Sequence, residues 1–489
     1  MNAASPPRTV SSRGDLTTGP IASTLLIFSL PTLGSNILQS LNGTINTIWI
    51  GHFLGEAALA ATSNTNIIMF LLFGAVFGFG MASTILVGQS FGRGDVDAAR
   101  RAVGTSIGML IVGALLIGGL GWYYAPDLLA MMGTPAAAMP LALDYLRVVL
   151  LSFPSVMILV VLMMALRGVG DSMTPLWFMG LAVILDAGLN PVFILGLGPA
   201  PALGIAGSAT ATVIANGVAV IAMIVYIYAR DLAIRLRGPE WRYLWPDSAL
   251  LGKILAKGLP MGAQMLVISG SSLAIIGLIN REGVDTVAAF GVVMQLWNYV
   301  QMPVMAIGAS VSAMAAQNIG AGRWDRIGPI ARAGTGFGLA ITAAVVVVIV
   351  LLDRPLLALF DLGAASPATG LAENMLLLAS WGFVLFAITM VVLSVVRANG
   401  AVLGPLLIFA VALFPVRIGF AVAMRPWLGA DALWWSFPAG SIVAALLSVI
   451  YYRYGKWREI RLLDQPDPEE AREQAMAGCE PTGRLHPTG

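Results

Sequence analysis

The chain has 489 residues, of which 58% are hydrophobic and 11% are charged, and its formal net charge is +2. Soluble domains carry about 25% charged residues, so this composition excludes an ordinary soluble enzyme, and so small a net charge gives no support to nucleic acid as a partner. One cysteine, Cys479, and two histidines, His52 and His486, are too few for an internal disulfide, a cysteine-based metal cluster or a histidine-rich metal site.

Twelve apolar stretches follow one another along the chain, and each is long enough to cross a membrane, which takes about 20 residues. The polar segment 1–19 precedes the first stretch, which is longer than the roughly 7–15 apolar residues of a signal peptide. The sequence therefore predicts an all-α membrane protein that keeps its first helix. In chain order the predicted spans are 21–49, 57–88, 99–122, 139–165, 173–197, 203–228, 253–280, 285–316, 328–352, 373–397, 403–424 and 432–454.

Basic residues gather on one side of this predicted topology. The segment 1–19, the linker at 229–252 and the tail at 455–489 all carry Lys or Arg, whereas the loops on the other side carry few and often end in Asp or Glu. Because loops rich in Lys and Arg stay in the cytoplasm, we expect both termini and the linker to be cytoplasmic. The polar tail is expected to be disordered.

Sequence landmarks recur at nearly one offset, which indicates an internal duplication. The matched pairs are Leu30-Pro31 with Leu259-Pro260, 55–61 with 283–289, 89–94 with 317–322, and 167–170 with 397–400, at offsets of 229, 228, 228 and 230 by subtraction. The chain therefore divides into an N-lobe at 20–228 and a C-lobe at 253–454, with six helices each. Since six is even, both lobes enter the membrane in the same direction, and a pseudo-twofold axis along the membrane normal is expected to relate them.

These landmarks resemble the MATE (multidrug and toxic compound extrusion) family of transporters. The residues that carry the resemblance are Leu30-Pro31 with 45–51, then 88–95, 166–171 with Thr174-Pro175, and 189–194 followed by 204–212. The resemblance covers about 15–455, nearly the whole chain. It implies two six-helix lobes that form a V around a cavity, and the export of organic, often cationic, compounds driven by protons or sodium ions.

Asp186 is the one carboxylate that falls in the middle of an apolar span. An ionised Asp at the bilayer centre costs at least ~2.5 kcal/mol, and such residues usually face a cavity or mark an ion pathway. A buried carboxylate can bind and release a proton near neutral pH, and with neutral oxygen ligands it also suits a sodium ion. The alternative is a protonated Asp that bonds a neighbouring helix. The coupling role is favoured, because an Asn would fill that structural role at lower cost.

The resemblance implies an ion-coupling site around this carboxylate. Asn190 lies one helical turn after Asp186, on the same face. The ion-coupled branches of the family usually have Asn at the position of Asp186 and Asp at the position of Asn190, so the two residue types are exchanged here. These branches also commonly have Asp where Asn46 stands, so this N-lobe has one carboxylate fewer. The coupling ion and its stoichiometry therefore do not carry over, although a single carboxylate favours the proton. The predicted ion-coupling residues are Asp186, Asn190, Asn46, Ser208 and Thr212, with sodium possible at Asp186, Asn190 and Thr212.

The hydroxyls of Ser208 and Thr212 have an alternative role, which is a bond to the backbone of their own helix.

Polar residues spaced by three and four form a stripe on the first helix, and they line a cavity or contact other helices. In the C-lobe, methionines could form an adaptable binding wall or simply pack. The predicted substrate-cavity residues are Asn36, Gln39, Gln264, Met261 and Met265.

In the C-lobe, the seventh and tenth spans of the chain, 253–280 and 373–397, contain no carboxylate in their middle. Coupling is therefore expected in the N-lobe, as in the DNA-damage-inducible F branch of the family. Arg417 is the only cation inside a span. Its side chain either extends to the outer membrane boundary or binds an anionic substrate, and the first is favoured.

The sequence thus predicts a secondary antiporter, not an enzyme, that uses H+ or Na+ to export organic, cationic, drug-like compounds by alternating access. No cofactor is expected, and the predicted partners are small organic substrates and membrane lipid. The Ala and Gly content fits a bacterial source, which would place this multi-pass protein in the inner membrane. The duplicated lobes need no partner, so a monomer is expected. The alternative is a flippase for a lipid-linked or glycan substrate, whose cavity should hold several Arg or Lys. A P-loop for ATP is absent from the sequence.

Overall fold

The computed structural model describes residues 14–136, 138–358, 367–460 and 462. Every regular element within these ranges is helical, and 12 helices are long and apolar enough to cross a membrane. The outward faces of these helices expose large apolar side chains, among them Leu116, Ile184 and Leu407, which are 61–72% exposed. Helices that are apolar on their outer face are stable in lipid rather than in water. The chain is therefore a multi-pass membrane protein, as its composition predicts.

The 12 spans form two bundles of six, in keeping with the predicted fold class. In the N-lobe the helices are α1 (Ile21–Leu54), α2 (Glu56–Gly92), α3 (Val96–Tyr123), α5 (Met139–Gly168), α6 (Met173–Leu195) and α7 (Ile205–Ala229), with a short α4 (Ala125–Met131). In the C-lobe they are α8 (Ser248–Ile279), α9 (Val284–Gly320), α10 (Ile327–Leu351), α12 (Pro367–Ala379) with α13 (Trp381–Ala398), α14 (Leu403–Val411) with the π-helix η3 (Ala412–Ile418) and α15 (Gly419–Ala423), and α17 (Asp431–Tyr454). Shorter elements are η1 (Gly238–Leu244), η2 (Trp324–Arg326), α11 (Asp353–Ala358), α16 (Arg425–Leu428) and η4 (Lys456–Glu459).

The duplication is visible in the helix bounds. Helices α2 and α9 begin at residues 56 and 284 and end at 92 and 320, so both ends differ by 228. The lobes also differ in two places. The predicted span 373–397 is two helices, α12 and α13, with a break at Ser380. Helix α6 is continuous, whereas its counterpart contains the π-helix η3.

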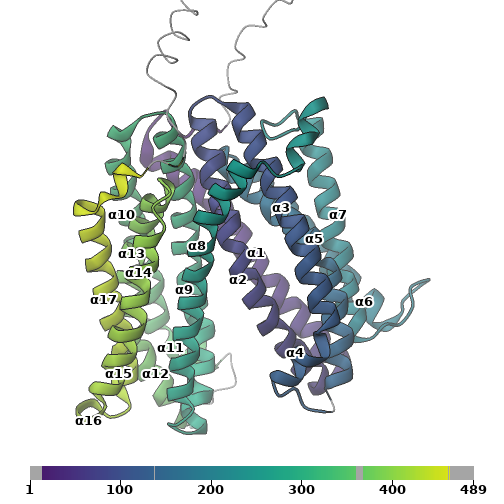
Figure 1. The fold of residues 1–489 in the computed structure, drawn as a ribbon. Coiled ribbons are helices and arrows are strands. Elements are labelled where there is room, and N and C mark those ends of the chain that lie inside the picture. The colour runs from purple at the N-terminus through teal and green to yellow at the C-terminus, as the bar shows by residue number, and fades with distance from the viewer. Residues whose placement is uncertain (1–13, 137, 359–366, 461, 463–489) are drawn as a thin grey trace, which may run out of the picture.

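The two lobes meet at the end of the molecule that holds residues 14–20 and the connection between α7 and α8, here called the linker end. Figure 1 shows the bundles converging there and separating toward the opposite end. The helices cross closely because glycines face one another: a Cβ on Gly78 of α2 would overlap the backbone of Gly258 and Gly262 in α8. Small residues at membrane helix contacts permit such an approach.

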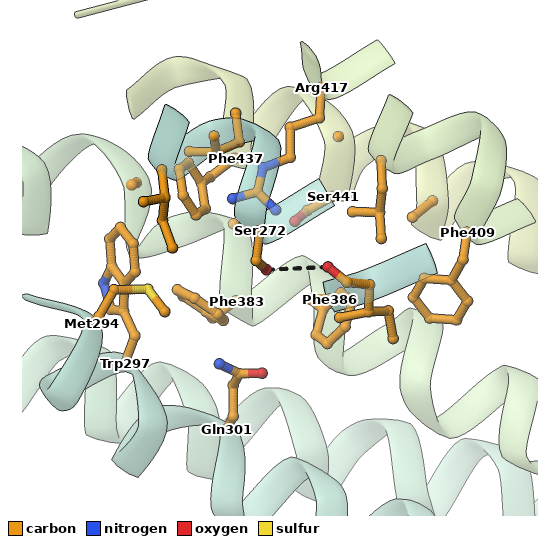
Figure 2. Close-up of a pocket in the computed structure, with 18 of the residues that line it drawn as sticks. Ser272, Met294, Trp297, Gln301, Phe383, Phe386, Phe409, Arg417, Phe437 and Ser441 are labelled. Atoms are coloured by element: carbon orange, nitrogen blue, oxygen red, sulfur yellow. Dashed lines mark hydrogen bonds between the residues drawn. The ribbon is translucent and has the colours of Figure 1, made fainter. Parts of the chain in front are cut away.

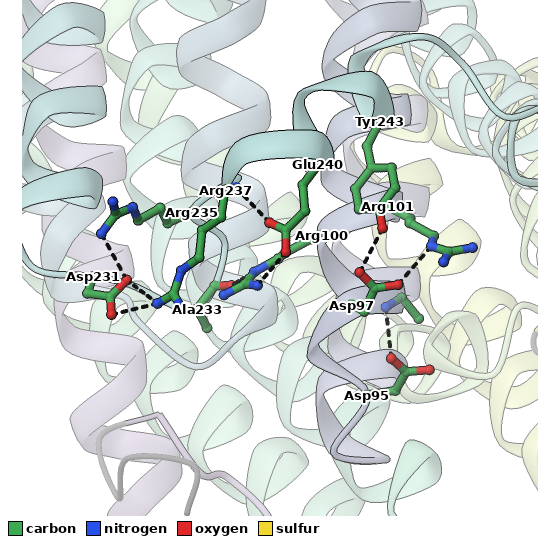
Figure 3. Close-up of polar contacts among 11 residues, drawn as sticks. Asp95, Asp97, Arg100, Arg101, Asp231, Ala233, Arg235, Arg237, Glu240 and Tyr243 are labelled. Atoms are coloured by element: carbon green, nitrogen blue, oxygen red, sulfur yellow. Dashed lines mark hydrogen bonds and ion pairs between the residues drawn. The ribbon is translucent and has the colours of Figure 1, made fainter. Parts of the chain in front are cut away.

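The connection between the lobes is folded against α3. Its η1 turn is held by an ion pair of 2.9 Å between Arg100 and Glu240 and by a hydrogen bond of 2.8 Å that Tyr243 donates to Asp97 (Figure 3). A Cβ on Gly108 would overlap the carbonyl oxygen of Leu244, so this glycine lets the connection lie directly on the helix. The linker is therefore held against α3 of the N-lobe before it leads into α8.

Candidate functional site

Asp186 lies on the face of α6 that points into the N-lobe. It is 1% exposed, whereas Ile184, two residues earlier on the same helix, is 72% exposed. The 100° rotation per residue of an α-helix turns these two side chains to opposite sides. The apolar side chain thus faces lipid and the carboxylate faces α1 and α7.

Three neutral side chains hydrogen-bond the Asp186 carboxylate. Asn46 of α1 donates to Oδ2 over 3.0 Å. Thr212 of α7 and Asn190 of α6 donate to Oδ1 over 3.0 and 3.1 Å. Asn42, one turn before Asn46, is close enough to interact with the carboxylate. Three helices therefore converge on one carboxylate without supplying a countercharge, and a buried charge that has only neutral partners favours binding a proton or a cation.

The amide of Asn190 connects the site further. Its Nδ2 donates to Asn46 Oδ1 over 2.9 Å and to the backbone oxygen of Asp186 over 2.9 Å. Its own Oδ1 is buried without a hydrogen-bond partner, and so is the Ser208 hydroxyl on α7. Unpartnered buried oxygens are the exception in proteins. The carboxylate and the Asn190 oxygen are ligands of the kind that a sodium ion prefers.

Thr212 can serve its own helix as well as the carboxylate. Its Oγ1 lies 3.0 Å from Asp186 Oδ1 and 3.2 Å from the backbone oxygen of Ser208. A hydroxyl has one hydrogen to donate, so the two acceptors compete for it. The Thr212 hydroxyl is therefore placed for both predicted roles, a bond to the Asp186 carboxylate and a bond to the backbone of its own helix.

Two further residues belong to this site and were not expected from the sequence. Asn42 precedes Asn46 by four residues, so the i,i+4 spacing within α1 could have identified it. Tyr145 of α5 is buried, and it is close enough to the Asp186 carboxylate to be affected by its charge. No sequence pattern links Tyr145 to a carboxylate on another helix.

The predicted substrate-cavity residues do not lie together. Asn36 is half-buried and Gln39 is exposed on α1, and Met265 is half-buried on α8. Met261 and Gln264 are buried in α8, where Gln264 Oε1 accepts from Arg397 over 3.4 Å. The cavity role of these five residues stays a prediction.

A pocket lies inside the C-lobe between α8, α9, α13, η3 and α17 (Figure 2). Its wall is made mainly of aromatic and aliphatic side chains, and none of the five predicted cavity residues is among those that line it. Arg417 does line it. The expectation that this side chain extends to the membrane boundary is wrong, because its guanidinium is turned into the pocket, 3.7 Å from the centre of the Phe437 ring.

Comparison with known proteins gives concordant matches. The family model MatE matches residues 31–192 and 260–423, one segment in each lobe. The chain is 32% identical over 430 residues to the Bacillus subtilis (strain 168) "Probable multidrug resistance protein YoeA", covering 88% of this chain and 92% of that one. It is 27% identical over 351 residues to the "FAD transporter" of Shewanella oneidensis, covering 71% and 76%. Its fold resembles the structure titled "Crystal structure of MATE in the straight conformation", with a TM-score of 0.82, 21% identity and coverage of 92% and 98%.

Proposed function

The chain belongs to the MatE family, the multidrug and toxic compound extrusion transporters, and from this membership we propose a secondary antiporter that exports drug-like organic cations in exchange for a coupling ion. The proposed ion is the proton, with sodium as the alternative. The observation that carries the coupling proposal is the Asp186 carboxylate, which is 1% exposed and bonded by neutral groups of three helices. The absence of a mid-span carboxylate in the C-lobe sequence supports a likeness to the DNA-damage-inducible F branch.

Protonation of Asp186 would change the contacts among those helices. An ionised carboxylate only accepts hydrogen bonds, whereas a protonated one must also donate. The added proton needs an acceptor, so the amides of Asn46 and Asn190 and the hydroxyl of Thr212 are expected to reorient around the new hydroxyl. Because these side chains stand on α1, α6 and α7, a single proton alters the packing of half the N-lobe. This is the proposed link between ion binding and alternating access.

The five cavity residues predicted on α1 and α8 are proposed to contact substrate in a state that differs from this one. The linker end is proposed to face the cytoplasm of a bacterial cell, in keeping with its basic residues, and the transporter is proposed to act as a monomer. A flippase for lipid-linked glycans has less support, since a polyanionic cargo calls for several basic side chains and the described pocket has Arg417 alone.

The test is ethidium movement in proteoliposomes under an imposed pH gradient or an imposed sodium gradient, each applied alone. We expect the pH gradient to drive transport in the wild type and in Asp144→Asn, whose carboxylate is an exposed one in the same lobe. We expect Asp186→Asn to lose it. Transport driven by sodium alone would replace the proton by Na+ as the coupling ion. Unchanged coupled transport in Asp186→Asn would refute the coupling site.

FAD should be tested as a second cargo in the same vesicles, because one relative is named for its transport. We expect ethidium to be transported and FAD not. The reverse result would overturn the proposed cationic cargo and leave the coupling site to be judged by Asp186→Asn.

A further inference from the structure

We propose that the C-lobe pocket is a second binding site, which takes an amphipathic organic anion with its carboxylate on Arg417 and its aromatic body against the ring-lined wall. This inference goes beyond the proposed function, because it concerns the other lobe and the opposite charge.

The guanidinium of Arg417 has the surroundings of an unfilled anion site. Its Nε is buried without a hydrogen-bond partner, its face stacks on Phe437, and no acidic residue is among the pocket's described lining. A cation within a membrane span is costly unless something pairs with it. The planar fork of a guanidinium fits a carboxylate with two parallel hydrogen bonds. A bound carboxylate would therefore satisfy both the charge and the unpartnered nitrogen.

The remaining wall fits the apolar body of such a ligand. Trp297 packs against Phe383 and Phe437 with ring centres 5.3 and 4.9 Å apart, so the rings form one continuous surface. The indole nitrogen of Trp297 is already used, because it donates to Ser380 over 3.0 Å. Only its apolar ring is left for a ligand. Flat aromatic surfaces bind aromatic ligands by offset or edge-on contact.

The polar groups mark the two ends of the pocket. Figure 2 shows Arg417 on one side and Gln301 on the other, with Phe383 and Ser272 between them. The Ser272 hydroxyl donates to the backbone of Ile268 over 3.1 Å, so it is not free to donate to a ligand. The favoured ligand thus has one anionic end, an aromatic middle and a neutral far end that Gln301 can hydrogen-bond.

Arg417 lies in a stretch of unusual backbone geometry. The residue lies in the π-helix η3, which replaces regular α-helix over residues 412–418. Such wide turns are rare and often occur at functional sites. Helix α17 passes close by at Gly440, where a Cβ would lie 3.1 Å from the carbonyl oxygen of Ala412 and 3.2 Å from Arg417 Cβ.

The pocket occupies the place in the C-lobe that the Asp186 site occupies in the N-lobe. The offset of 230 relates residues 167–170 to 397–400. At this offset the C-lobe equivalent of Asp186 is Val416, the residue before Arg417. At the offset of 229 between α1 and α8, the equivalent of Asn46 is Ile275, which lines the pocket. Equivalent regions of the two lobes therefore hold a carboxylate and a guanidinium, and we assign a cation to one and an anion to the other.

The test is equilibrium binding of radiolabelled 2-naphthoate to the full chain in lipid nanodiscs, with neutral 2-naphthamide as the matched ligand. We expect the wild type to bind naphthoate more tightly than naphthamide. Arg417→Gln should weaken naphthoate about 10- to 100-fold, the value of hydrogen bonds to a charged group, and leave naphthamide unchanged. Arg417→Lys should bind naphthoate more tightly than Arg417→Gln, since it keeps the charge.

Two controls keep the result interpretable. Arg354→Gln removes an exposed arginine of the same lobe and should bind naphthoate like the wild type. Asp186→Asn should also bind it normally, so failure of the N-lobe coupling and failure of this site are distinguishable. If Arg417→Gln does not fold, the lysine variant and the naphthoate-to-naphthamide ratio of the wild type decide. Equal binding of the two ligands by the wild type, or unchanged naphthoate binding in Arg417→Gln, would overturn the proposal.

Discussion

The protein accommodates three charged side chains of its spans differently: Asp186 and Arg417 inside a span, and Arg397 at the end of one. Asp186 is surrounded by neutral donors from three helices. Arg397 is 8% exposed and donates to the neutral oxygens of Ser394 and Gln264 over 2.9 and 3.4 Å. Arg417 faces a pocket. Removing one partner from a buried charge costs more than the hydrogen bond itself, so the residues around Asp186 should respond sharply to substitution.

Thr212→Val is predicted to lower ion-driven transport about tenfold, because it removes one donor to Asp186 at constant shape, worth roughly 1.5 kcal/mol. Thr210→Val is the matched control, since the Thr210 hydroxyl donates to its own helix at Ala206, over 2.7 Å. The measurement is the initial rate of ethidium transport at several imposed pH gradients. Equal losses in the two variants would mean that Thr212 acts only through its helix backbone.

At the scale of elements, paired glycines set how closely the lobes approach. Helices α2 and α9 cross at Gly92 and Gly320, which are related by the offset of 228. A Cβ on Gly92 would overlap the carbonyl oxygen of Gln317, and a Cβ on Gly320 would overlap that of Gln89. The same contact is therefore made twice, once by each lobe, and neither position has room for a side chain.

Gly320→Ala is predicted to lower the unfolding temperature, because the methyl group forces the two helices apart at a cost of about 1–3 kcal/mol. Gly113→Ala on α3 should be neutral or slightly stabilising, since a Cβ there meets open space and Ala is the better helix former. Thermal unfolding of the detergent-purified variants distinguishes the two. A Gly320→Ala protein as stable as Gly113→Ala would show that the crossing relaxes without cost.

At the scale of the whole molecule, reciprocal hydrogen bonds hold the lobes together at the linker end. Gln89 of the N-lobe donates to the carbonyl oxygen of Ala398 over 2.6 Å, and Gln317 of the C-lobe donates to that of Gly168 over 2.9 Å. Residues 14–19 add to this contact, because Gln317 Oε1 accepts from the Leu16 backbone over 3.0 Å. Any alternating-access cycle must break these bonds and make them again.

Loss of both glutamines should therefore shift the population toward a state open at the linker end. Spin labels at Met131 and Val284 report on the opposite end, where both residues are 85% exposed. With Cys479 replaced by Ser, we predict a shorter distance between these labels in Gln89→Met/Gln317→Met than in the protein with both glutamines. Pulsed electron double resonance measures these distances. Gln295→Met is the control substitution and should leave the distances unchanged. Unchanged distances in the double variant would show that the glutamines do not set the equilibrium.

Much of the fold follows from the sequence alone, because its signals are local. Runs of apolar residues suffice to predict the 12 spans, and landmarks at a constant offset suffice to predict the two lobes. The break at Ser380 could not be predicted, since the residues on both sides of it are equally apolar. The functional site is divided in the same way: Asp186 stands out because it is the one carboxylate in mid-span, and Asn190 because it lies one turn away.

The tertiary structure alone decided which side chains from distant helices meet. It brings Asn42 and Tyr145 to Asp186, it buries Gln264 beside Arg397, and it turns Arg417 into a pocket. Hydropathy measures how each segment partitions between water and lipid, so it fixes which segments span the membrane. The direction of a side chain within a bundle depends on helix rotation and crossing, which are set by contacts between segments far apart in the chain.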